Sequence, residues 1–186
     1  MSRPRLPTAI ELAHQLIRER LSPGDTAVDA TVGNGHDTVF LASIVGAGGR
    51  VIGFDIQETA IQITAAKASG FPHVTLHVES HESIGKYVTG GVQAVMFNLG
   101  YLPGGDKSIT TRPESTIKAL NLSTNLLSGG GLITIAVYGG HPGGEQEATA
   151  LEEWSRQLPQ EGFGVAKYQF LNQRNSPPYL LVIGRR

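Results

Sequence analysis

The stretch VDATVGNGHDT, from Val28 to Thr38, constrains the fold more than any other part of the chain. It has the pattern of a buried strand, a glycine turn and the first turn of a helix. Gly33 and Gly35 let the backbone lie close to a ligand, and a helix start presents free N–H groups to it. A second strand over 51–55 ends in Asp55, an acid that can accept hydrogen bonds from ribose hydroxyls. These features predict a nucleotide-type ligand at the ends of two neighbouring strands.

Two cofactors use this arrangement. A dinucleotide site requires Gly-x-Gly-x-x-Gly/Ala, in which the last small residue lets helix and strand pack closely. Here Thr38 occupies that last position, and the motif gives no role to Asp29, four residues before Gly33. S-adenosylmethionine has no pyrophosphate, and a carboxylate such as Asp29 can help to hold its charged methionine end. The residues therefore favour S-adenosylmethionine over NAD, with a tight turn that binds no ligand as a third interpretation.

Composition excludes several classes of site. The 186 residues include 15 Lys+Arg and 16 Asp+Glu, a net charge of −1, so no general basic field indicates nucleic acid, although a local patch is enough for RNA. The absence of cysteine excludes disulfides, thiolate metal sites and cysteine nucleophiles. No apolar run approaches the roughly 18 residues of a membrane span, and residues 1–7 lack a signal-peptide core. We expect a soluble protein in the cytoplasm, or in the plastid stroma if the source is a plant.

Strand-like and helix-like segments alternate along the chain. Strands are expected over 26–31, 50–55, 74–78, 92–98, 132–138, 165–171 and 179–183. Helices are expected over 8–21, 37–45, 58–69, 114–127 and, on the surface, 145–158, with a short helix after 79–82. The alternation predicts an α/β fold with a mostly parallel seven-stranded sheet and helices on both faces, closed by a C-terminal antiparallel hairpin. This is the Rossmann-like fold of class I S-adenosylmethionine-dependent methyltransferases, and we expect residues 1–186 to form a single such domain.

In an open α/β sheet, ligands bind beyond the carboxyl ends of the strands. The residues from which we expect cofactor contacts are Asp29, Thr31, Gly33, Asn34, Gly35, Asp37, Thr38, Asp55, Gln57, Ser80, His81 and Asn98. Ser80 and His81 are expected beside the adenine ring, with a capping serine and a surface histidine as the alternative. His77 and His81 have a metal-ligand spacing only on a helix, and here they straddle a strand and its exit, so no metal is expected.

The segment from Asn98 to Pro103, NLGYLP, is the most specific signal outside the glycine turn. An amide at a strand end, then a kinked backbone and an aromatic residue, resembles the Asn-Pro-Pro-Tyr of enzymes that methylate amines. The Asn98 amide oxygen and a backbone carbonyl near Leu99 can accept two hydrogens of an amine. The Tyr101 ring can stack on a base or attract a sulfonium. We expect these three residues to be catalytic; the alternative is a strand end with a core-facing tyrosine.

Three polar loops are candidates for binding the acceptor. A long loop from 99 to 112 contains a lysine that can bind a phosphate. A loop rich in glycine and proline contains a histidine that is a candidate proton acceptor. The amides and the arginine of the last hairpin turn can form hydrogen bonds with base edges or with phosphate. With the aromatic residue above, the predicted acceptor-binding residues are Tyr101, Asp106, Lys107, His141, Gln173, Arg174 and Asn175. Solvated loops are the alternative for all three segments.

Taken together, these motifs resemble one small family, the tRNA 5-aminomethyl-2-thiouridine (mnm5s2U) methyltransferases, which also carry the name rRNA methylases. The segments that carry the resemblance are 29–38, 54–57, 80–81, 97–111 and 168–178, within a likeness from Ile10 to Val182. The block 97–111, FNLGYLPGGDKSITT, is far more specific than the glycine turn. One departure is Gly139-Gly140 before His141, where we expect the family to carry a histidine in place of one glycine, and this weakens a proton-relay role for His141. Residues 1–7 are variable and carry nothing over.

The resemblance implies methyl transfer from S-adenosylmethionine to the exocyclic aminomethyl group of the wobble uridine, with the tRNA anticodon arm as the partner. Asp29 and Gly33 would hold the methionine end, Asp55 the ribose and His81 the adenine side. No strong general base is evident, so the proton would leave to water. Methylation of rRNA or of a small molecule, a non-catalytic nucleotide-binding module and a dehydrogenase are the alternatives. Neither membrane nor metal is expected as a partner, and the oligomeric state, including a homodimer, stays open.

Overall fold

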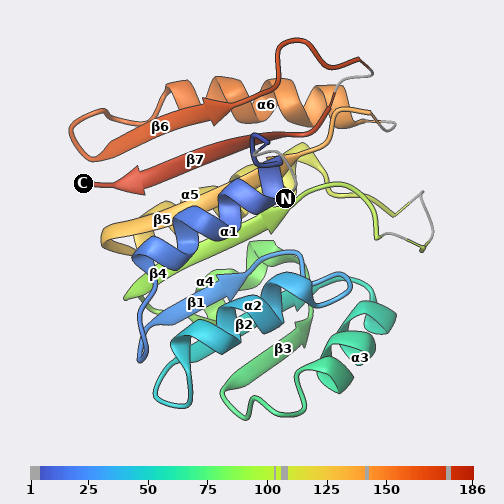
Figure 1. Cartoon of the computed structure of the whole chain (residues 1–186), viewed down its shortest axis with the longest axis vertical. Coiled ribbons are helices and arrows are strands. Elements are labelled where there is room, and N and C mark those ends of the chain that lie inside the picture. The colour runs from blue at the N-terminus through green and yellow to red at the C-terminus, as the bar shows by residue number, and fades with distance from the viewer. Residues whose placement is uncertain (1–4, 103, 106–108, 141–142, 175–176) are drawn as a thin grey trace.

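Seven strands form one sheet in the order β3-β2-β1-β4-β5-β7-β6 (Figure 1). The computed structural model describes residues 5–102, 104–105, 109–140, 143–174 and 177–186. Strands β1 to β5 are parallel, whereas β7 is antiparallel to both β5 and β6. The strands are β1 (Thr26–Asp29), β2 (Arg50–Asp55), β3 (Val74–Val78), β4 (Val92–Asn98), β5 (Leu127–Val137), β6 (Phe163–Tyr168) and β7 (Tyr179–Arg185). The predicted fold class, including the closing antiparallel hairpin, is confirmed.

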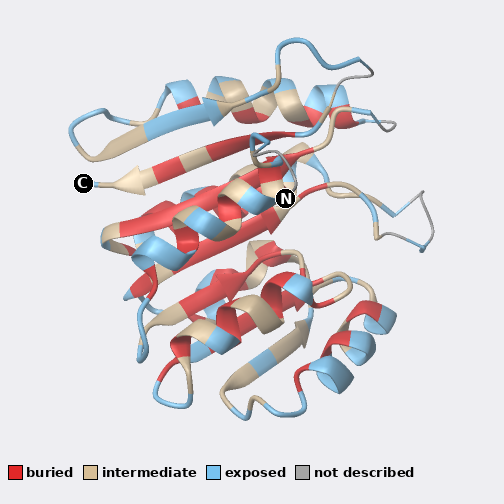
Figure 2. Cartoon of the chain, viewed as in Figure 1, coloured by how far each residue is buried: buried red, intermediate tan, exposed pale blue. Residues whose placement is uncertain are grey.

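Helices cover both faces of the sheet, and a separate apolar core fills each interface. The helices are α1 (Ala9–Arg20), α2 (His36–Val45), α3 (Glu58–Lys67), η1 (His81–Ser83), α4 (Ile84–Tyr87), α5 (Pro113–Leu126) and α6 (Gly144–Arg156). One core packs α1 and α2 on the sheet, and the other packs α4, α5 and α6 on the opposite face. The central strands β1, β4 and β5 are buried along most of their length (Figure 2). In the part of the chain that is described, no helix is long and apolar enough to cross a membrane.

Helix α1 begins where its sequence predicts. The Thr8 hydroxyl accepts from the Glu11 N–H at 3.3 Å, and the Glu11 carboxylate accepts from the Thr8 N–H at 2.8 Å. This reciprocal capping box satisfies two N–H groups that the helix itself cannot pair. The buried face consists of Ala9, Ala13 and Ile17, at helical spacing. The capping box therefore fixes the residue at which α1 begins.

Strand β5 differs from its prediction. It was expected to start at residue 132, after a glycine turn, but it begins at Leu127 and includes Gly129 to Gly131. The register with β4 shifts there, from Val92 opposite Leu127 to Ala94 opposite Leu132. The glycines therefore form an irregularity inside the strand, and Gly130 has a φ of 77° that suits glycine. A glycine cluster typical of a turn hid this extension from the sequence.

Two other strand ends differ by a few residues. Strand β1 stops at Asp29, so Thr31 lies in the turn and not in the strand. Strand β6 covers Phe163–Tyr168 where 165–171 was expected.

The carboxyl ends of the parallel strands share one edge of the sheet, because these strands all run in the same direction. In Figure 1, β3 and β4 point toward the right. That edge is where a ligand site is expected.

Candidate active site

One cavity of about 830 Å³ opens at the carboxyl edge of the sheet. Its walls come from the ends of β1, β2, β3, β4 and β5, from the first turns of α1 and α2, and from the segment before α5. The predicted site residues that line it are Thr31, Gly33, Asn34, Asp37, Asp55, Gln57, Ser80, His81, Asn98, Leu99 and Tyr101. Most of the residues expected to contact the cofactor therefore share one space with Asn98, Leu99 and Tyr101, the three residues expected to be catalytic.

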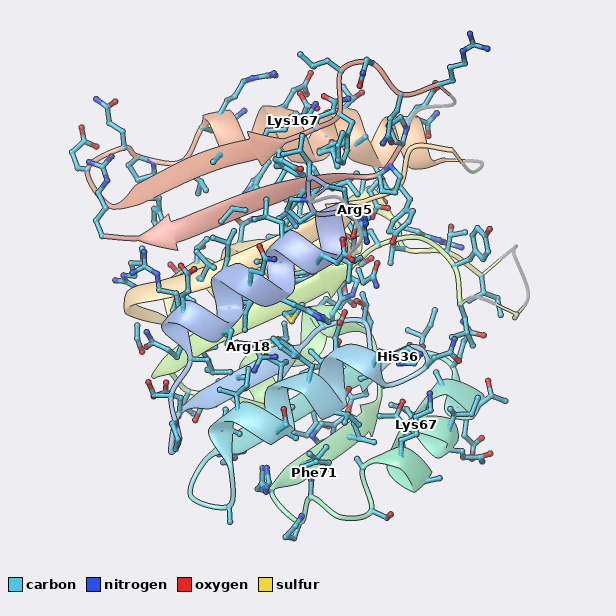
Figure 3. All side chains as sticks on the ribbon, viewed as in Figure 1. Arg5, Arg18, His36, Lys67, Phe71 and Lys167 are labelled. Atoms are coloured by element: carbon cyan, nitrogen blue, oxygen red, sulfur yellow. The ribbon has the colours of Figure 1, made fainter. Side chains whose placement is uncertain are left out.

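The glycine turn is held in place from β2 and α3. Asp55 accepts from the backbone N–H groups of Gly33 and Gln57 at 2.8 and 2.9 Å, one at each carboxylate oxygen. From α3, the Thr64 hydroxyl donates to the Gly33 carbonyl at 3.2 Å. The ammonium of Lys67, which is labelled in Figure 3, donates to the Asn34 carbonyl at 2.6 Å. Each Asp55 oxygen keeps a further lone pair, so this oriented carboxylate can still accept from ribose hydroxyls in the cavity.

His81 lines the cavity and has one ring nitrogen without a hydrogen-bond partner among the described residues. Its side chain is buried, with the ring Nδ1 at 3.2 Å from the Ala30 carbonyl oxygen. A carbonyl only accepts, so Nδ1 carries the hydrogen and Nε2 is the acceptor. Nε2 is buried and has no hydrogen-bond partner among the described residues. Burial lowers the pKa of His81, which favours this neutral form. The alternative of a surface histidine is wrong, while Ser80 does cap η1 by accepting from the Glu82 N–H at 3.4 Å.

Asp29 lies behind the cavity wall. Its carboxyl is fully buried and accepts from the Thr38 hydroxyl at 2.6 Å and from the Thr31 N–H at 3.2 Å. Burial, together with the nearby Asp37 carboxylate, raises the pKa of Asp29 to about 7. Thr38 is also fully buried, and a Cβ at Gly35 would lie 2.6 Å from the Thr64 hydroxyl. These residues do not line the cavity, so they shape the turn, and the geometry does not support direct contact between them and a cofactor.

The acceptor side of the cavity begins at the end of β4. The Asn98 N–H donates to the Thr31 hydroxyl at 2.7 Å, and the Leu99 N–H donates to the Ala136 carbonyl at 3.0 Å. Tyr101 pairs with Thr110 in an isolated antiparallel bridge and is 37% exposed. The alternative of a core-facing tyrosine is therefore wrong. Tyr101 stands at the mouth of the cavity, where a ring can stack on an incoming base.

A histidine and carboxylate pair from two helices also faces the cavity. The His14 Nε2 lies 2.6 Å from Asp37 Oδ1, and both residues line the cavity. The His14 ring stacks on Phe40, with 4.0 Å between ring centroids, which fixes its orientation. Sequence reasoning missed His14. The available signal was weak: a polar residue flanking the apolar face of the helix predicted over 8–21.

Tyr138 and Arg112 also line the cavity, from the end of β5 and the start of α5. Burial and the nearby Asp37 raise the pKa of Tyr138, so its hydroxyl remains protonated. Arg112 is exposed at the mouth, where a cation can meet a phosphate. The predicted site residues included neither of them.

Several predicted acceptor residues lie elsewhere. Gln173 and Arg174 are exposed in the connection between β6 and β7, and Gln173 lines a separate groove of about 520 Å³ beside the start of α1. The structure therefore does not bring them into the main cavity. The remaining predicted residues, Asp106, Lys107, His141 and Asn175, lie outside the described residues.

The two histidines that were considered for a metal have separate environments. The His77 ring stacks on Tyr87 with 3.7 Å between centroids, whereas His81 packs edge-on against Phe97 at 5.7 Å. Over the described ranges, no three His, Asp or Glu side chains gather as a metal ion would require.

Comparison with known proteins gives consistent results. A family model described as "Putative rRNA methylase" matches residues 51–184. A chloroplastic tRNA (mnm(5)s(2)U34)-methyltransferase of Arabidopsis thaliana is 38% identical over 190 residues, which cover 95% of this chain and 69% of that protein. A putative rRNA methylase structure from Clostridium thermocellum has a TM-score of 0.96 at 45% identity, covering 98% of this chain and 100% of that one. A putative methyltransferase from Streptococcus mutans, solved in complex with SAH, has a TM-score of 0.91 at 38% identity, with coverage of 98% and 100%.

Proposed function

Because the chain belongs to the tRNA (mnm5s2U34)-methyltransferase family, whose model is described as "Putative rRNA methylase", we propose that it methylates the wobble uridine of tRNA. The chain is an S-adenosylmethionine-dependent methyltransferase. The acceptor atom is the exocyclic nitrogen of a 5-aminomethyl group, so nm5(s2)U becomes mnm5(s2)U. The observation that carries this proposal is that Asp55 and His81, suited to a nucleoside, share one cavity with Asn98, suited to an amine.

The cavity fits the adenosine part of the donor. Adenine has an exocyclic amino group that donates hydrogen bonds, and the orphaned Nε2 of His81 is a buried acceptor that such a donor would satisfy. Asp55, held by two backbone N–H groups, accepts from the ribose hydroxyls. When bound, S-adenosylmethionine supplies an electrophilic methyl group on a positively charged sulfur. The residues of the chain bind, orient and shield the reacting groups.

The methionine end of the donor carries an ammonium and a carboxylate. We assign it to Asp37 and His14, because their paired side chains line the cavity and offer a carboxylate beside an imidazole. Asp29 was expected in this role, but its carboxyl is buried behind the wall and already accepts two hydrogen bonds. Asp29 instead fixes the turn that carries Gly33.

The acceptor amine arrives neutral and is oriented by the Asn98 amide oxygen and by backbone near Leu99. The amine nitrogen forms a bond to the methyl carbon as the bond from that carbon to sulfur breaks, and the amine then loses a proton to water. Such a displacement requires alignment and exclusion of water more than acid or base catalysis. Tyr101 at the mouth stacks on the uracil ring and closes the pocket.

The test uses purified protein, S-adenosylmethionine and tRNA from a strain that lacks the corresponding gene. Mass spectrometry of digested nucleosides is expected to show loss of 5-aminomethyl uridines and an equal gain of the methylaminomethyl form. Ribosomal RNA from the same strain is the matched control. Methylation of rRNA, or of neither RNA, would contradict the proposal and favour the alternative acceptors, rRNA or a small molecule.

A further inference from the structure

A buried carboxylate outside the cavity is connected to the acceptor segment. Glu147 lies in the first turn of α6 and is 2% exposed. Its Oε1 accepts from the Thr116 hydroxyl at 2.8 Å, and its Oε2 accepts from the Thr111 hydroxyl at 2.7 Å. A carboxylate near a helix N-terminus is favoured by the helix dipole, yet full burial of a charge is rare without a structural or functional reason. The two hydroxyl groups identify the residues that this carboxylate holds, Thr111 and Thr116.

Thr111 carries the connection onward to the segment that follows β4. Its hydroxyl oxygen accepts from the Gly100 N–H at 3.0 Å, and its backbone N–H donates to the Gly100 carbonyl at 3.0 Å. Because the hydroxyl oxygen accepts from Gly100, its single hydrogen is the one donated to Glu147. Gly100 has a φ of 123°, a conformation that side-chain-bearing residues rarely adopt. A backbone of this kind persists where surrounding groups hold it.

We propose that Glu147 is a positioning residue for methyl transfer: it orients the Thr111 hydroxyl, which fixes Gly100 and thereby the aim of Asn98 and Tyr101. The inference rests on the proposed function, since it concerns how that site presents its acceptor. The opposite end of the segment is held by the Thr31 hydroxyl through the Asn98 N–H. Two threonine hydroxyls thus hold the segment, and the buried carboxylate of Glu147 accepts from one of them, that of Thr111.

Among the described residues, the hydrogen bonds given above for Glu147 and those that orient the donor side of the cavity involve different residues. The groups assigned to adenine and ribose, His81 and Asp55, are oriented by Ala30, Gly33 and Gln57. Loss of the Glu147 connection should therefore lower kcat and leave the dissociation constant for S-adenosylmethionine unchanged. A residue that only stabilises the fold would not separate these two quantities.

The threonines provide a matched pair of variants. Thr111→Val and Thr116→Val are nearly isosteric, and each removes one hydroxyl hydrogen bond to the same carboxylate. Only Thr111→Val also breaks the link to Gly100. We expect Thr111→Val to reduce kcat with tRNA by about 10-fold or more, with unchanged donor affinity by calorimetry, and Thr116→Val to stay within about twofold of wild type in kcat.

Amide hydrogen exchange at Gly100 provides a readout that does not depend on the acceptor. It should accelerate by about 10-fold or more in Thr111→Val and remain near wild type in Thr116→Val. Glu147→Gln, which keeps one acceptor oxygen, should retain more activity than Glu147→Leu. If Glu147→Leu fails to fold, Glu147→Gln tests the role of the carboxylate, and the threonine pair tests the connection to Gly100.

Equal losses of kcat in the two threonine variants, or weaker donor binding in Thr111→Val, would overturn the positioning role. Failure of the wild-type protein to methylate tRNA would instead contradict the proposed function. In that case the Gly100 exchange rates still test the connection by themselves. Similar rates in the two variants would overturn it.

Discussion

The backbone N–H of Asn98 donates a 2.7 Å hydrogen bond to the hydroxyl of Thr31, which joins the end of β4 to the turn after β1. The donor side and the acceptor side of the cavity therefore share this bond. Thr31→Val should leave the Asn98 N–H unsatisfied and lower the free energy of unfolding by about 1–3 kcal/mol, with a loss of methyl transfer. Denaturant unfolding and turnover check this. Thr75→Val, at an exposed position of β3, is the control and should change neither; an identical response in both variants would show that the bond is unimportant.

Asp55 should be a major determinant of donor affinity. Two backbone N–H groups already orient its carboxylate. Its remaining lone pairs can therefore accept from the donor without further ordering of the side chain. Asp55→Asn should weaken S-adenosylmethionine binding by about 10- to 100-fold, the range for loss of hydrogen bonds to a charged group. Titration calorimetry measures it. Asp25→Asn is the control. The Asp25 carboxylate also accepts a hydrogen bond from a backbone N–H, that of Ser22 at 2.7 Å, but it lies outside the cavity. Equal affinity for Asp55→Asn and Asp25→Asn would remove Asp55 from the site.

Asp37 and Asp29 should differ in their effect on the donor. Asp37 lines the cavity with His14, whereas Asp29 is behind the wall. Asp37→Asn should weaken donor binding by about 10-fold, because it removes a charge opposite the donor's ammonium. Asp29→Asn keeps an oxygen for Thr38 and should have a much smaller effect on the same dissociation constant. The reverse order would restore the assignment that the sequence suggested.

The raised pKa of Asp29 predicts a dependence of stability on pH. In the folded protein this carboxyl holds its proton up to about pH 7, whereas in the unfolded chain it loses the proton near its ordinary value of 3.8. Between these values the folded state binds more protons, so the contribution of Asp29 to stability falls as the pH rises. Asp29→Asn removes this contribution. The melting temperature of the variant relative to wild type should therefore increase from pH 5 to pH 8, and a constant difference would contradict the burial of an ionisable carboxyl there.

The sequence indicated the residues at strand ends correctly because strand pattern and chain direction locate them. Asp55 and Asn98 follow apolar runs, and parallel strands bring such ends to one edge of a sheet. The same pattern could not decide on which side of the cavity wall a side chain lies. Asp29 is two residues from Thr31, yet Asp29 is buried behind the wall and Thr31 lines the cavity.

Contacts between distant segments were the part that the sequence could not provide. His14 meets Asp37 across 23 positions, and Glu147 meets Thr111 across 36. Residues 145–158 were expected to form a surface helix, and that pattern gives no information about which residues of other segments face each position. Glu147 is buried where the hydroxyls of Thr111, before α5, and Thr116, within α5, donate to its carboxylate.

The central claim is that one cavity holds the donor while Asn98 aims an amine at it. Single-turnover methyl transfer to tRNA by Asn98→Ala, with S-adenosylmethionine saturating, tests it most directly. We expect the rate to fall by about 100-fold with an unchanged donor dissociation constant, because misalignment of reacting groups lowers the rate of transfer by that order. A single-turnover rate equal to that of the wild type would contradict the account.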